Sequence, residues 1–130
     1  MLMAPWIATR RGWFAKGYSQ HPGFNFKETL APTVRYSTIQ IILTIAALQD
    51  LELHLVDICH AYLNGDLEEE IYMQQLEGFE VGGPEFVCKR NKSLYGLKQA
   101  GQVWNKKLHS VLLSMGFECA QSDDGLYIFS

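Results

Sequence analysis

The stretch from Leu51 to Gly65 constrains the fold more than any other part of the chain. Apolar and polar residues alternate over Leu51–Val56, a period of two that predicts a strand with one buried face. The carboxylate of Asp57 follows at the end of this strand, and the pair Asn64-Gly65 then ends the unit with a turn. The sequence therefore predicts a sheet with an acidic residue at its lip.

The position of Asp57 has two interpretations. A carboxylate where a strand stops is well placed to hold a metal ion or a proton. The simpler alternative is an Asp that caps a short helical turn beginning at Ile58. Capping aspartates are far more common than catalytic ones, so position alone favours the cap.

Size and composition are those of one globular domain. The 130 residues are 48% hydrophobic and 19% charged, so the chain can bury a core and is not expected to be disordered. No apolar run reaches the roughly 18 residues that cross a bilayer, and Met1–Trp6 lacks the regions of a signal peptide. We therefore expect no membrane attachment and an intracellular location. The three scattered cysteines fit reduced thiols and show no zinc-binding spacing.

Charge is segregated along the chain, although the net charge is only −3. Nine acidic residues and no Lys or Arg lie between Asp50 and Glu80, whereas six Lys or Arg and no acid lie between Phe86 and Lys107. This segregation suggests one face for a metal or other cation and another for an anion. The alternative is two solvated surfaces of opposite sign that attract each other.

The order of predicted elements is typical of an α+β fold, with a mostly antiparallel sheet and helices packed on one face. Apolar spacing predicts two helices, the first of them well buried, and the remaining apolar runs predict strands. The predicted elements are a strand or hairpin within 6–18, a helix at 39–49 with Ser37 and Gln40 as its capping box, strands at 51–56, 71–73 and 86–89, a helix at 99–115 followed by Gly116 as its C′ residue, and a strand at 126–129.

Several collinear stretches of this chain closely resemble the reverse transcriptase of copia-type LTR retrotransposons, which are transposable elements. The resemblance covers roughly residues 10–130 and is specific because so many pieces occur in the same order. The matching stretches are Ala15–Gln20, Glu28–Arg35, Val56–Gly65, Glu69–Met73, Lys92–Ala100 and Trp104.

The resemblance implies an RNA-directed DNA polymerase, a nucleotidyltransferase with a right-hand shape. The chain would be one truncated domain over residues 1–130 that supplies the fingers and the first part of the palm, with residues 1–9 as an atypical N-terminal segment. The implied partners are an RNA template, a DNA primer, deoxynucleoside triphosphates and the remainder of a Pol polyprotein.

The family reaction is two-metal nucleotidyl transfer, in which Mg²⁺ ions activate the primer 3′ hydroxyl and stabilise the leaving pyrophosphate. By resemblance, Asp57 matches the first metal-binding and catalytic aspartate. Ile58 matches the neighbour whose backbone carbonyl can also face the metal. Carboxylate oxygens suit Mg²⁺, which explains the need for an Asp.

The resemblance also assigns residues to the incoming nucleotide. Tyr62 matches the aromatic residue on which the sugar packs, and its bulk would exclude a ribose 2′-OH. Gln99 matches the glutamine that lines the nucleotide pocket. Lys16 and either Arg10 or Arg11 lie in the fingers segment that contacts the triphosphate, and Arg11 is the arginine expected there.

The sequence departs from the family pattern at three places. Gly12 stands where the family has a triphosphate-binding Arg, and Gly101-Gln102 replaces the usual Pro-Arg. The Tyr-x-Asp-Asp hairpin that carries the other catalytic carboxylates does not occur among the 130 residues. Asp123-Asp124 precedes a Gly-Leu-Tyr segment and is predicted to form a polar turn rather than that motif.

We therefore expect a fragment of a reverse transcriptase that is inactive alone and poorly soluble. The alternatives are a non-enzymatic nucleic-acid-binding remnant, which would use Lys89–Lys107 with Trp104 and Tyr95, and a pseudogene product without a role.

Overall fold

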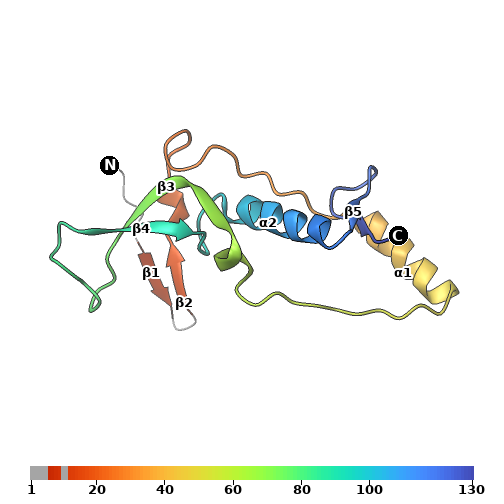
Figure 1. Ribbon diagram of the computed structural model, residues 1–130. Helices are drawn as coiled ribbons and strands as arrows, with labels where there is room; N and C mark the ends of the chain where they lie inside the picture. Colours follow the sequence, from red (N-terminus) through yellow and green to blue (C-terminus); the bar gives the residue numbers. More distant parts are fainter. Residues whose placement is uncertain (1–5, 10–11) are drawn as a thin grey trace. The chain divides into compact units, whose positions relative to one another are not determined.

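The computed structural model describes residues 6–9 and 12–130 and has an α+β architecture, as predicted (Figure 1). The predicted N-terminal hairpin and both predicted helices are present. The helices and strands are β1 (Trp6–Thr9), β2 (Gly12–Ala15), α1 (Tyr36–Leu48), β3 (Asp66–Gln74), β4 (Val87–Lys92), α2 (Ala100–Ser114), β5 (Glu118–Cys119) and β6 (Tyr127–Ile128), with short 3₁₀ turns η1 (Gly17–Ser19) and η2 (Ala61–Asn64).

Within the described residues, the strands form three separate two-stranded antiparallel sheets rather than the one sheet expected. Each strand pairs only with its neighbour in the chain. The chain divides into two compact units, one made of residues 1–30 and 60–107 and the other of residues 31–59 and 108–130.

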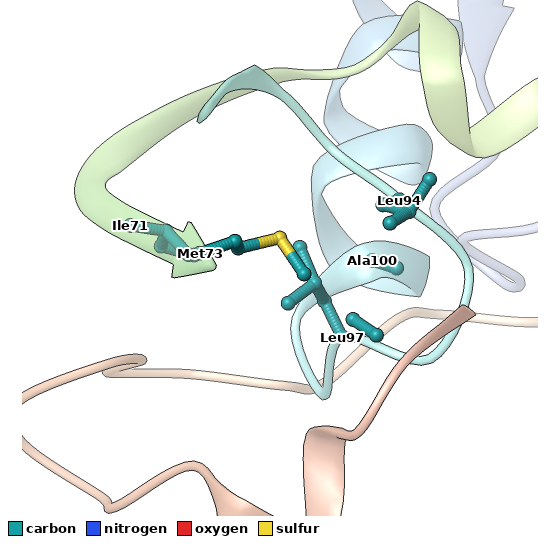
Figure 2. Close-up of a cluster of buried hydrophobic side chains, with 6 residues drawn as sticks. Ile71, Met73, Leu94, Leu97 and Ala100 are labelled. Carbon is teal, nitrogen blue, oxygen red and sulfur yellow. The ribbon is translucent and has the colours of Figure 1, made fainter. Parts of the chain in front are cut away.

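The first unit is built on a small apolar core between β3 and the loop that leads into α2 (Figure 2). Ile71 and Met73 lie on the same face of β3 and are almost completely buried, as the period of a strand requires. Met73 reaches from the strand toward Leu97 (Figure 2). The cluster consists of Ala15, Ile71, Met73, Leu94, Leu97 and Ala100.

The predicted strands at 71–73 and 86–89 are confirmed as parts of β3 and β4, whose register pairs Met73 with Cys88. β3 is longer than predicted because it also contains the acidic residues from Asp66 onward. A register shift lies between Asp66 and Ile71.

The C-terminal end of α2 is confirmed in detail. The Gly116 N–H donates to the carbonyl of Leu113 at 3.0 Å, and the Phe117 N–H donates to the carbonyl of Leu112 at 3.0 Å. These two bonds form a Schellman motif, which makes Gly116 the C′ residue, as predicted.

In the second unit, α1 confirms the predicted helix, but its predicted capping box is wrong. Ser37 lies inside the first turn, and the N-cap is Arg35, whose side chain makes no capping bond. The cap is supplied from a distance by Asp123, whose Oδ2 accepts from the Arg35 N–H at 2.9 Å and from Thr38 Oγ1 at 2.6 Å. A remote carboxylate thus accepts hydrogen bonds from the N-cap N–H and from a side-chain hydroxyl in the first turn, near the positive end of the helix dipole.

The predicted burial of α1 is also wrong. Ala46 is the only residue of α1 that is buried, whereas Ile41 is 59% exposed and Leu48 is 81% exposed. A helix that is apolar nearly all round needs neighbours on several sides. The described part of the second unit covers only a small part of its surface.

The predicted strand at 51–56 does not form. Leu51–Val56 has no regular secondary structure, and every residue in it is exposed, Leu55 completely. A strand is stable only when a neighbour accepts and donates its backbone hydrogen bonds, and no described segment pairs with this one.

The end of the second unit is a short hairpin, and it confirms the predicted final strand. β6 pairs with β5, and the Phe117 and Phe129 rings pack with centroids 5.3 Å apart. The connecting turn contains Asp123, whose Oδ1 accepts from the Gly125 N–H at 2.9 Å, so the predicted polar turn is confirmed. None of the helices in the described part of the chain is long and apolar enough to cross a membrane.

Candidate functional site

Three aromatic rings form a series on the core of the first unit. Tyr62 lies in η2 and packs against the buried cluster, so its ring is half-buried. Its centroid is 4.6 Å from that of Tyr95, with the rings tilted by 59°. The Phe14 ring meets the Tyr95 ring edge-on, with their centroids 5.9 Å apart. Such tilted and edge-on contacts are favoured by the charge distribution of aromatic rings.

The backbone around Tyr95 is held by direct contact between two chain segments. The Ala15 N–H donates to the Tyr95 carbonyl at 2.8 Å. Gly96 has a φ of +92°, and a Cβ there would lie 2.1 Å from the Ala15 carbonyl oxygen. A Cβ on Gly17 would lie 1.9 Å from the Gly96 carbonyl oxygen. Neither glycine leaves space for a side chain, so backbone packs on backbone at this point.

Gln99 is completely buried and takes part in a relay of hydrogen bonds. The Lys98 N–H donates to Gln20 Oε1 at 2.8 Å, Gln20 Nε2 donates to Gln99 Oε1 at 3.1 Å, and Gln99 Nε2 donates to the Asn25 carbonyl at 2.9 Å. Because the first donor and the last acceptor are backbone groups, the direction of both side-chain amides is fixed. The relay joins the loop before α2 to the loop that follows η1.

Lys16 lies at the start of η1 and is half-buried. Its carbonyl accepts from the Ser19 N–H at 3.0 Å and from Ser19 Oγ at 2.8 Å, which holds the backbone of the turn. Lys16, Tyr62 and Gln99 all belong to the first unit. Arg10 and Arg11, the other residues expected at the triphosphate, lie outside the described residues.

Asp57 and Ile58 belong to the second unit, in the irregular segment that follows α1. Both are exposed, Ile58 by 45%. The capping alternative for Asp57 is wrong, because the next helical turn is η2, its N-cap is His60, and no side chain caps it. His60 has a left-handed φ of 55°, an uncommon conformation for a residue with a side chain.

The residues described do not complete a magnesium site. No group of three or more His, Cys, Asp or Glu side chains that could hold a metal occurs among them. Asp57 and the Ile58 carbonyl would supply only part of the roughly six oxygen ligands that Mg²⁺ requires. The surroundings of Asp57 are therefore too incomplete, in the described part of the chain, to fit the ion.

Two carboxylates of the acidic stretch pair with lysines of the basic stretch, which favours the alternative of two attracting surfaces. Lys92 pairs with Asp66, and Lys89 with Glu70; Lys107 Nζ lies 3.4 Å from Asp66 Oδ2. The hydrogen bond from Lys92 lowers the pKa of Asp66, and that from Lys89 lowers the pKa of Glu70. The same bond to Glu70 raises the pKa of Lys89.

Nothing in the sequence indicated a role for Gln20 or Asn25, or a contact between the Tyr62 and Tyr95 rings. Gln20 was visible only as the last residue of a matching stretch, and its partner Gln99 lies 79 residues away. No local pattern signals such a pair.

Comparisons with a protein-family model and with known proteins all match this chain to reverse transcriptases or to transposon polyproteins. The model of a family described as "Reverse transcriptase (RNA-dependent DNA polymerase)" matches residues 9–130. The chain is 49% identical over 113 residues to the Retrovirus-related Pol polyprotein from transposon TNT 1-94 of Nicotiana tabacum, with 86% of the chain and 8% of that protein covered. It is 39% and 38% identical over 115 residues to the polyproteins from transposons RE1 and RE2 of Arabidopsis thaliana, with 88% of the chain covered in each case.

The chain spans about 8% of the length of each of these relatives. No solved structure matches it.

Proposed function

Because this chain belongs to the reverse transcriptase (RNA-dependent DNA polymerase) family, we propose that it is the nucleotide-binding segment of a retrotransposon polymerase. The observation that carries the proposal is the continuous match over residues 9–130, together with 49% identity to a transposon Pol polyprotein. The substrates would be an RNA template, a DNA primer and deoxynucleoside triphosphates. Within the reverse transcriptase family, the polymerase would be of the copia type. Its complete fold would have the right-hand shape, and this chain would supply the fingers and the first part of the palm.

In this proposal, Tyr62 is the residue on which the deoxyribose packs. Its half-buried ring rests on the core and on Tyr95, so it cannot easily withdraw. A bulky ring held in this way leaves no space for a 2′-OH. Selection against ribonucleotides would then be steric.

Lys16 and Arg11 would contact the triphosphate, since both carry the positive charge that phosphate groups require. Gln99 would support the wall of the pocket. Its complete burial and its bonds with Gln20 and Asn25 favour a role in holding the loop before α2 over direct contact with the base.

Asp57 would contribute a catalytic carboxylate, and Ile58 a carbonyl oxygen, to a magnesium site shared with residues outside this chain. We propose that the 130-residue chain does not extend a primer by itself, because these two oxygen donors are too few to hold the metal.

The test is a chimera. Residues 9–130 replace the matching segment in the reverse transcriptase of the transposon TNT 1-94 polyprotein, and RNA-templated primer extension is measured. We expect the chimera to extend the primer and Asp57→Ala in the chimera to reduce extension at least a thousandfold. Asp50→Asn, which removes another exposed carboxylate of the same unit, is the matched control and should leave extension unchanged.

Two outcomes would contradict the proposal. The first is full extension by the chimera with Asp57→Ala. The second is extension by the 130-residue chain alone, which would show that it contains a complete catalytic centre.

A further inference from the structure

We propose that Tyr95 is a positioning residue that sets the preference for deoxynucleotides by holding the ring of Tyr62. This inference rests on the proposed role of Tyr62 toward the sugar. It assigns to Tyr95 an effect on the choice of substrate without direct contact with the reacting atoms.

The first support is the contact between the two rings. Their centroids are 4.6 Å apart, within the range of a favourable aromatic pair. Tyr62 lies in η2, a single short turn with no side-chain cap. A residue on such a turn depends on its packing neighbours to keep one position, and the Tyr95 ring is the aromatic neighbour described for it.

The second support is that both the ring and the backbone of Tyr95 are in contact with the segment around Ala15. Phe14 packs edge-on against its ring, and the Ala15 N–H binds its carbonyl. The next residue, Gly96, packs its backbone against Ala15 without space for a Cβ. The Tyr95 ring is 38% exposed, but its contacts with Phe14 and Tyr62 and the fixed backbone beneath it limit how far it can move. A wall discriminates between substrates only when it keeps its position.

The third support is the chemistry of the discrimination. Ribose and deoxyribose differ by one hydroxyl group, so a ring that shifts by even part of an ångström would admit both sugars. An apolar wall alone rejects an added hydroxyl only moderately. The selectivity should therefore depend on how firmly the bulky ring of Tyr62 is held in place.

The experiment measures the binding of dCTP and CTP, which differ only at the 2′ position, to the chimera described above, assembled with an RNA template and a DNA primer, by titration calorimetry in Mg²⁺ buffer. For the wild type we expect CTP to bind about tenfold or more weakly than dCTP. In Tyr95→Ala we expect this ratio to fall toward one, mainly because CTP binds more tightly.

Two further variants separate positioning from a general structural role. Tyr95→Phe keeps the ring and should restore the wild-type ratio. Phe117→Ala removes an aromatic pair of similar geometry in the other unit and should leave the ratio unchanged, even if it lowers stability. If Tyr95→Ala does not fold, as judged by circular dichroism, Tyr95→Leu and Phe14→Leu take its place, with the same expected direction.

The outcomes distinguish the two proposals. A wild-type preference that survives in the folded Tyr95 variants overturns the role of Tyr95 and leaves that of Tyr62 intact. Equal binding of both nucleotides by the wild type overturns the role of Tyr62 and with it the inference. No binding of either nucleotide overturns nucleotide binding by this chain, and both proposals fail together.

Discussion

Asp123 receives three hydrogen bonds within the second unit, from Thr38 Oγ1, the Arg35 N–H and the Gly125 N–H. All three stabilise the ionised carboxylate, so they lower its pKa, with the Thr38 bond as the largest cause. Since the folded pKa lies below the unfolded one, the stabilisation is present above the unfolded pKa and is lost as the pH falls through the folded pKa.

We therefore predict that α1 loses helicity in acid at a pH below the ordinary range for Asp. Asp123→Asn should lower the thermal midpoint at neutral pH by a few degrees and should flatten the acid dependence. Circular dichroism at 222 nm against pH measures both effects. Asp124→Asn, which changes the exposed neighbour, is the control, and an unchanged acid profile in Asp123→Asn would contradict the cap.

Gln20 gives a second prediction at the scale of a residue. Gln20→Ala removes the partner of the part-buried Lys98 N–H and of the buried Gln99 Oε1. A buried group left without its partner costs about 1–3 kcal/mol. We expect a corresponding drop in the free energy of unfolding measured with urea. Gln121→Ala, at an exposed glutamine, should change that free energy by less than about 0.5 kcal/mol. Equal effects of the two substitutions would show that the relay contributes nothing.

Single residues could be predicted from sequence only where their partners are local. Gly116 was predicted correctly because a helix C-terminus is defined by its own last turn. The roles of Asp123 and Gln20 could not be predicted, because their partners lie 88 and 79 residues away in the chain. Ser37 was wrongly assigned the cap for the same reason, since a local motif competed with a remote carboxylate.

At the scale of an element, the turn at Gly96 should tolerate no side chain. Gly96→Ala combines a left-handed φ with a Cβ 2.1 Å from a backbone oxygen, so we expect a loss of about 3 kcal/mol or more in the free energy of unfolding. Gly78 is the matched control, because its φ is +81° but nothing lies within 4 Å of its Cβ position. Gly78→Ala should therefore cost only about 1 kcal/mol. Similar losses in both variants, measured by urea unfolding, would exclude a close approach at Gly96.

The β3–β4 hairpin gives a prediction about nucleic acid. Lys89 and Lys92 are paired with carboxylates, which lowers the positive charge available to phosphates. A double variant that carries both Glu70→Gln and Asp66→Asn removes these two carboxylates. It should free Lys89, Lys92 and Lys107. We expect tighter binding of single-stranded RNA, with the slope of log K against log salt steeper by up to about 2.

Fluorescence anisotropy with labelled poly(U) at several salt concentrations measures this slope. Glu118→Gln with Glu52→Gln changes the net charge equally without freeing these lysines and is the control. A wild-type slope as steep as that of the double variant would favour the alternative of a nucleic-acid-binding remnant.

Elements with a self-contained pattern were predicted well. Both helices and the strands around Met73 and Val87 follow from apolar spacing. The strand at 51–56 was predicted wrongly. Alternation of apolar and polar residues specifies which face of a strand would be buried but not whether a partner strand exists. The same limit applies to α1, whose apolar residues indicated burial although the described residues leave most of them exposed.

At the scale of the whole molecule, exposed apolar surface should dominate the behaviour in solution. Leu48 and Leu55 are 81% and 101% exposed, and many other large apolar side chains are also exposed. Such surface promotes association. We predict that the purified chain forms soluble aggregates, and that Ile41→Gln with Leu48→Gln increases the monomeric fraction without loss of helicity.

Size-exclusion chromatography with light scattering measures the monomeric fraction. Met73→Gln, at a residue with 0% exposure, is the control and should unfold the first unit rather than improve solubility. A monomeric wild type with a single cooperative transition would contradict the prediction.

The family could be recognised from sequence because its motifs are collinear, and the comparisons confirm it. The candidate site was only partly predictable. Tyr62, Lys16 and Gln99 fall in one compact unit, but the burial of Gln99 and the support of Tyr62 by Tyr95 depend on three-dimensional packing. Asp57 stays a prediction, because its exposed segment does not provide a complete set of metal ligands.

The remote cap on α1 also has a consequence for folding during synthesis. The ribosome completes α1 long before it adds Asp123, so the Arg35 N–H must wait for about 75 further residues before the Asp123 carboxylate accepts its hydrogen bond. Both units combine an early and a late stretch of the chain. A nascent chain would therefore hold each unit incomplete until its late stretch has been synthesised, and the early stretch would stay available to chaperones until then.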